Sequence, residues 1–193
     1  MKKPMKNSVK YLVVGLGLAL SPLTHADEND CQLTVSQSEV NYTQLRREDV
    51  VTTQQSWHKM AEREITVNAS CPENVQMGVQ ALGAAGEKGR FQFGQKGGVA
   101  FKVSHVTVDG KEYSAGKTVD QINLTPESGS GAAQYIHSND VIVAVENNAV
   151  PAGKQMSFKV ILFPVLNDSA FSDNSDETAL EADITWQLLT RAK

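Results

Sequence analysis

The chain has 193 residues, and its 18 Lys and Arg against 22 Asp and Glu give a formal net charge of −4. This length is typical of one domain and is sufficient to bury a core. An acidic chain without clusters of Lys and Arg lacks the charge pattern that nucleic acids and anionic membranes require, so we expect neither as a partner.

The first 26 residues have the pattern of a cleavable secretion signal. A basic segment with Lys2, Lys3, Lys6 and Lys10 precedes an apolar run at 11–20, and Thr24 and Ala26 are small residues at positions −3 and −1 of a cleavage site. The run is shorter than the roughly 20 residues that span a bilayer, which disfavours an uncleaved anchor and membrane insertion. The pattern predicts a signal peptide at 1–26, export through the inner membrane to the periplasm, and one mature domain at 27–193.

The mature chain is more acidic than the precursor. Four of the 18 basic residues lie in the signal, so 14 remain against 22 acidic residues, a net charge of about −8. Its only cysteines are Cys31 and Cys71. Because thiols are oxidised in exported proteins, we expect one disulfide between them, with two free structural thiols as the alternative.

Apolar and polar residues alternate with period two through most of the mature chain, which predicts β-strands. Leu33 and Val35 follow Cys31 on one face of the first run, and Cys71 ends the apolar face of the second run, at 64–71. Further runs follow at 75–79, 91–93, 99–103, 106–108, 141–145, 158–162 and 180–188. We expect both cysteines to stand on the apolar faces of their strands.

Turn signals separate these runs. Asp109-Gly110 predicts a hairpin, Gly97-Gly98 a break, and the Ser/Gly-rich segment 127–131 a loop. Residues 44–60 fit neither period, so we expect a long connection there with at most a helical turn. Many short strands separated by turns predict an all-β fold, an antiparallel β-sandwich of immunoglobulin type.

Motifs of catalysis and metal binding are missing from the mature sequence. Its three histidines, His58, His105 and His137, are in neither an HExxH nor a His-x-His motif, and Gly129-Ser130-Gly131 fits a flexible loop better than a nucleophile turn. We therefore expect no enzyme activity, no metal and no cofactor.

Two other features have a structural and a functional interpretation. The acidic stretch 168–181 could ligate calcium but lacks EF-hand spacing, which favours a solvated loop. Trp57 could stack on a sugar or cover one end of the sandwich.

The last alternating run, 180–188, places Ile184, Trp186 and Leu188 on one face, and only residues 189–193 follow it. An apolar strand face must be buried, and a strand edge requires a partner. Together with the secretion signal and the single cysteine pair, this suggests a sheet finished by a strand from another molecule; the alternative is that Trp186 and its neighbours are ordinary core of a closed sandwich.

Together, the signal peptide, Cys31 in the first strand, Cys71 about 40 residues later and the alternating last strand resemble the pilin subunits of bacterial chaperone-usher fimbriae. The segment 31–44, Cys-Gln-Leu-Thr-Val-Ser-Gln-Ser-Glu-Val-Asn-Tyr-Thr-Gln, is similar to the opening of a poorly characterised fimbrial group related to the pilins. The resemblance covers the whole mature chain. It implies an incomplete immunoglobulin-like sandwich that lacks its seventh strand.

The resemblance also implies a function at the cell surface. A periplasmic chaperone would fill the gap during transit, an outer-membrane usher would export the subunit, and a neighbouring subunit would then donate the missing strand, which is donor-strand complementation. The groove would be lined by Leu33 and Val35 from the first strand and by Ile184, Trp186 and Leu188 from the last. The expected role is a fimbrial subunit in adhesion, with a host or surface receptor as a further partner.

Two departures from the family pattern qualify these expectations. Only four mature residues, 27–30, precede Cys31, whereas donor subunits carry an extension of ten or more, so we expect a tip or minor subunit that accepts a strand without donating one. The aromatic residue near the end of the family's chains is also missing, which leaves the chaperone's usual anchoring mode open. The alternative function is a self-complete secreted or periplasmic immunoglobulin-like binding module.

Overall fold

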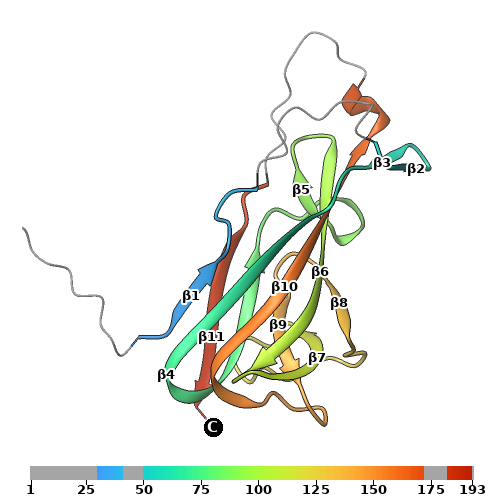
Figure 1. Cartoon of the computed structure of the whole chain (residues 1–193). Coiled ribbons are helices and arrows are strands. Elements are labelled where there is room, and N and C mark those ends of the chain that lie inside the picture. Colours follow the sequence, from blue (N-terminus) through green and yellow to red (C-terminus); the bar gives the residue numbers. More distant parts are fainter. Residues whose placement is uncertain (1–29, 41–49, 172–181, 193) are drawn as a thin grey trace, which may run out of the picture.

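The structure, a computed structural model, describes residues 30–40, 50–171 and 182–192 (Figure 1). The expected signal peptide and most of the acidic stretch 168–181 lie outside these residues. Within them the only helical segments are the short 3-10 turns η2 (Glu87–Gly89) and η3 (Asp168–Phe171). The all-β fold expected from the alternating pattern is confirmed.

The described residues form eleven strands, and every pairing between them is antiparallel. Their bounds are β1 Gln32–Val35, β2 Thr52–Gln54, β3 Trp57–Lys59, β4 Arg63–Leu82, β5 Phe91–Phe93, β6 Gly97–Val108, β7 Lys111–Thr118, β8 Ala133–Ile136, β9 Val141–Val145, β10 Ala152–Asn167 and β11 Thr185–Ala192.

Strand β4 passes from one layer of the sandwich to the other. Its register with β10 jumps from Ser70 opposite Gln155 to Val75 opposite Gly153, so residues 71–74 form a corner outside that ladder. Figure 1 shows this corner at the lower end of β4. The half of β4 before the corner pairs with β1 and β10, and the half after it pairs with β11 and β9.

The ladder closes on itself along one path and is open elsewhere. Strands β4, β9, β7, β6 and β10 pair in that order, and β10 returns to β4, which gives the sandwich a barrel-like side. Strands β5 and β8 extend β6, and the β2–β3 hairpin extends β10. Strands β1 and β11 are added to β4 outside the closed path.

The main core lies between the layers and is built from the inward residues of the alternating runs. Phe91, Phe101 and Phe158 are each at most 1% exposed, and the rings of Phe91 and Phe101 stack with centroids 4.4 Å apart. Burying a side chain of this size stabilises the fold by roughly 1.5–3 kcal/mol. A smaller cluster on the outer side of β9 packs its three valines against Leu124.

The structure corrects three sequence-based expectations. Residues 52–59, expected within a connection, form the β2–β3 hairpin, whose turn residues Gln55 and Ser56 have φ of 50° and 64°. Such a turn is usually signalled by Asn or Gly, which explains why the sequence did not indicate it. The runs at 64–71 and 75–79 belong to one strand, as do those at 99–103 and 106–108.

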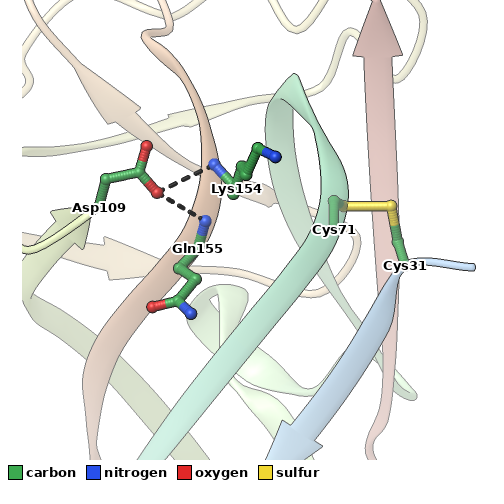
Figure 2. Close-up of a disulfide and its surroundings, with 5 residues drawn as sticks. All are labelled: Cys31, Cys71, Asp109, Lys154 and Gln155. Atoms are coloured by element: carbon green, nitrogen blue, oxygen red, sulfur yellow. Dashed lines mark hydrogen bonds between the residues drawn. A yellow bond between two sulfur atoms is a disulfide. The ribbon is translucent and has the colours of Figure 1, made fainter. Parts of the chain in front are cut away.

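The disulfide between Cys31 and Cys71 is confirmed. It joins the residue before β1 to the corner of β4 and links positions 40 residues apart in the sequence (Figure 2). Cys71 is 7% exposed, whereas Cys31 lies exposed at the surface, so only one cysteine stands on a buried face as expected. Because β1 has four residues, the covalent link is a large part of what fastens it to β4.

The predicted hairpin at Asp109-Gly110 is also present, and it is fastened to β10. Both residues have positive φ, 49° and 80°. The Asp109 carboxylate oxygen Oδ1 accepts the backbone N–H groups of Lys154 and Gln155, each at 2.9 Å, as Figure 2 shows. Gly153 is required beside them, because a Cβ atom there would overlap the Val108 side chain.

A second carboxylate shapes the turn after β7. Asp120 Oδ1 accepts the N–H groups of Ile122 and Asn123, and Oδ2 accepts the Thr125 hydroxyl. The hydrogen bond from Asn123, followed by those from Thr125 and Ile122, lowers the pKa of Asp120 from 3.8 to about 2. The turn directs Leu124, which is 1% exposed, into the smaller apolar cluster.

Replacing both cysteines, Cys31→Ser with Cys71→Ser, is expected to lower the free energy of unfolding by about 4 kcal/mol, because a loop of this length loses its crosslink in the unfolded chain. Denaturant titration of the oxidised protein and of the double variant measures the difference. An unchanged midpoint in the double variant would contradict the role of the link.

Asp109→Ala is expected to lower the free energy of unfolding by about 1–2 kcal/mol, because two backbone donors of β10 lose their acceptor. Asp109→Asn keeps one side-chain oxygen and tolerates the positive φ, so its loss should be smaller. Glu73→Ala, an exposed acid at the same end of the molecule, is the control and should leave the denaturation midpoint unchanged. Equal losses of unfolding free energy in Asp109→Ala and Glu73→Ala would show that the Asp109 carboxylate does not stabilise the contact between the hairpin and β10.

Stability should depend on Asp120 in acid. Its pKa is lower in the folded protein, so its contribution is fully present above the unfolded pKa of 3.8 and disappears as pH falls toward about 2. The melting temperatures of wild type and Asp120→Asn should therefore differ at pH 5 and converge between pH 4 and 2. Thr125→Val removes one donor to the Asp120 carboxylate. In that background, the melting temperatures with Asp and with Asn at position 120 should therefore differ less at pH 5. A gap between wild type and Asp120→Asn that stays constant down to pH 2 would contradict this role.

Candidate functional site: the free borders of β1 and β11

Strands β1 and β11 lie next to each other on one side of the sandwich, at the left of Figure 1. Within the described residues each pairs with β4 alone: β1 with 67–70 and β11 with 75–82. Neither strand forms a ladder with the other. Each therefore has one border without a strand partner in the described part of the chain, and the two borders flank the same side of the fold.

The two strands run in opposite directions. Gln32 at the start of β1 pairs with Ser70 just before the corner of β4, and Ala192 at the end of β11 pairs with Val75 just after it. Strand β1 therefore runs away from the corner, and β11 runs toward it. A further strand between them would be antiparallel to one and parallel to the other.

The five residues expected to line the site all come to this side of the molecule. Each is half-buried and packs against the main core; they are Leu33 and Val35 on β1, Ile184 just before β11, and Trp186 and Leu188 on β11. We call this set the β1/β11 border. By contrast, inward residues of the neighbouring strands are almost fully buried, with Val67 and Val160 at 0%. The border residues are thus less buried than these inward residues, although Val75 and Tyr113 elsewhere on the core are also half-buried.

Trp186 is the largest side chain of the border and lies on the aromatic part of the core. Its ring is nearly parallel to Phe101, at 12° and 5.9 Å between centroids, and tilted by 56° to Phe158 at 6.5 Å. These two rings form the floor beneath the border. Sequence alternation identified both as inward residues, but it could not indicate which strands would cross beneath Trp186.

The positions of both border strands are fixed by contacts at their ends. The N–H of Ser36, just after β1, donates to Thr66 O at 2.8 Å, and the Thr66 N–H donates to Ser36 Oγ at 2.9 Å. At the end of β11, Arg191 Nη1 donates to Asn123 O at 3.1 Å. With the disulfide at the start of β1, these contacts hold the two borders in place without a ladder between them.

The histidines named from the sequence lie in three separate places. His58 is 7% exposed and contacts Asp168 through Nε2 and the Thr53 hydroxyl through Nδ1, which joins the β2–β3 hairpin to η3. His105 is exposed beside Ser104, and the N–H of His137 donates to Asp140. Across the described ranges, no group of three His, Cys, Asp or Glu residues could hold a metal ion.

Trp57 and one largely buried ion pair also have partners within the fold. The Arg90 guanidinium lies 5.1 Å from the centroid of the Trp57 ring, so an arginine already covers one face of this aromatic. Lys117 Nζ lies 2.9 Å from Asp140 Oδ2, with side chains only 16% and 8% exposed. No motif in the sequence indicated this pair, which joins β7 to the turn before β9.

The described residues contain no helix that is long and apolar enough to cross a membrane. Comparison with known proteins found no family model that matches the chain and no match among curated proteins.

Proposed function

We propose that this protein is a fimbrial subunit of the chaperone-usher type, whose sandwich is completed by a strand from another molecule. The observation that supports this is the pair of free borders on β1 and β11, which flank a row of half-buried apolar side chains. Free strand borders are templates for strand addition, and pilin complementation is an established example of that mode.

A donated strand would act on two parts of the border. Its backbone would hydrogen-bond to the free borders of β1 and β11, and its alternate apolar side chains would cover Trp186, Leu188 and Val35. Complete burial of these five half-buried apolar residues would stabilise the folded subunit by several kcal/mol, at about 25 cal/mol per Å² of buried area. The isolated subunit would consequently be less stable than the completed one.

The partners follow from this proposal. A periplasmic chaperone would supply the strand first, an outer-membrane usher would export the complex, and a neighbouring subunit would replace the chaperone at the cell surface. Because only residues 27–30 separate the expected cleavage site from Cys31, the subunit would accept a strand without donating one. We therefore propose a minor or tip-type subunit in a fimbrium that serves adhesion.

A self-complete immunoglobulin-like binding module, secreted or periplasmic, is the second candidate. Two observations favour it: the ladder through β4, β9, β7, β6 and β10 is closed, and Trp186 already stacks on Phe101 and Phe158. Such a module would be a stable monomer and would not respond to a strand-like peptide.

A thermal melt of the protein from Asp27 onward, with and without a peptide, separates the two candidates. The peptide is at least ten residues long and alternates apolar and polar residues; the control peptide has the same composition with its apolar residues in one block. We expect the alternating peptide alone to raise the melting temperature. At a hundred times its dissociation constant the stabilisation would be about 2.7 kcal/mol.

Matched variants locate the effect. Leu188→Asp places a charge on the border and should abolish the rise in melting temperature that the peptide causes. Ile122→Asp replaces a side chain outside the border that is 80% exposed, and it should leave that rise unchanged. A sharp melt that neither peptide shifts would reject strand acceptance and favour the self-complete module.

A further inference from the structure

The outer face of β10, β6 and β8 carries an exposed aromatic residue. Among the large apolar or aromatic side chains that are exposed in the described residues, Val51, Val119, Ile122 and Tyr135, only the last is aromatic, and 57% of it is exposed. Tyr135 lies on β8, opposite Lys102 on β6. More than half of this side chain is therefore open to a ligand.

A second ring lies beside it. Phe163 on β10 pairs with the small residue Ala100 on β6, and the centroids of Phe163 and Tyr135 are 6.4 Å apart with 47° between the ring planes. Since β6 separates the two strands, the rings lean toward each other across it. We call Tyr135, Phe163, Lys102 and Lys59 the aromatic platform. All four residues stand on paired strands, so the platform is already ordered before any ligand binds.

The charges of this face differ from those of the whole chain. Lys59 Nζ lies 4.8 Å from the Phe163 ring centroid and 2.6 Å from Glu62, and Lys159 pairs with Glu64 at 2.9 Å. Within the described residues, no carboxylate lies within ion-pair distance of Lys102. Three lysines against two glutamates give this face a net charge of +1, on a chain of net charge −4.

The size of the platform indicates which kind of ligand it can bind. A stable protein interface buries about 800 Å² on each partner, whereas one aromatic side chain buries about 150–250 Å². Two rings therefore match a ligand unit of sugar size better than a protein surface. A sugar ring offers a flat C–H face for stacking on Tyr135 and hydroxyls for its phenol group, and an acidic sugar also offers an anion for Lys102.

We propose that the aromatic platform binds an anionic polysaccharide, with Tyr135 stacking on a sugar ring and Lys102 pairing with its carboxylate or sulfate. The order β1, β4, β10, β6, β8 places Tyr135 four strand pairings from β1, and Figure 1 shows β8 on the opposite side of the molecule from β1 and β11. The site is therefore separate from the β1/β11 border. It remains accessible whether or not a strand is added there.

Binding to three immobilised polysaccharides tests the proposal. We expect the wild-type protein to bind dextran sulfate and hyaluronan, which carry sulfate and carboxylate respectively, and not neutral dextran. Tyr135→Ala should weaken binding about tenfold, the upper range for one aromatic contact, and Tyr135→Phe should retain it. Lys102→Gln should weaken binding to the anionic chains while leaving the thermal melt unchanged.

Two variants control for general surface effects. Ile122→Ala removes an exposed apolar side chain elsewhere, and Lys111→Gln removes a lysine that is 61% exposed and lies 4.7 Å from the Tyr113 ring centroid. Both should bind like wild type. The proposal is overturned by wild-type protein that binds neither anionic chain, by unchanged binding in Tyr135→Ala, or by equal losses in Lys111→Gln and Lys102→Gln. Wild-type self-association that Tyr135→Ala abolishes would also overturn it, because the face would then be a protein interface.

Discussion

The corner of β4 at 71–74 is the constraint on which the rest of the structure depends. Pro72 has no backbone N–H to donate to a ladder, so the strand leaves its pairing with β10 at this point and resumes it in the other layer. Both border strands then pair with the same strand, one on each side of the corner. The disulfide at Cys71 holds the corner and β1 together. The neighbouring free borders, and with them the proposed strand-accepting site, result from this single bend.

The alternating pattern was sufficient to predict the fold class and most inward residues, because burial on a strand has a period of two. The disulfide was expected from the two cysteines together with the signal pattern, with free thiols as the alternative, and the structure decides for the disulfide. The alternating pattern did not predict β7 or β8, because Lys111–Thr118 contains few apolar residues and Ala133–Ile136 is only four residues long; pairing with β6 and β9 forms β7, and pairing with β6 forms β8. Tertiary pairing of this kind overrides weak local preference. Only the structure could show that β4 continues through Pro72.

The residues of the β1/β11 border were named from sequence because their alternation is clear, and the structure brings them together as half-buried neighbours. The function proposed for them depends on the resemblance to pilins and on the free borders. The aromatic platform had no comparable signal. Tyr135 and Phe163 are far apart in the sequence, and each looks like an ordinary strand residue until β6 brings them to one face.

The pairing of β11 with β4 also governs when the molecule can fold. Ala192 pairs with Val75, so the aromatic core beneath Trp186 is closed by contacts between residues far apart along the chain. Contacts of such high sequence separation form slowly, and strands are prone to aggregation until their partner strands pair with them. If the chain emerges from a membrane pore with its N-terminus first, β4 becomes available for pairing long before β11 does. In the proposed export, β4 would therefore need protection against misassembly before β11 is available.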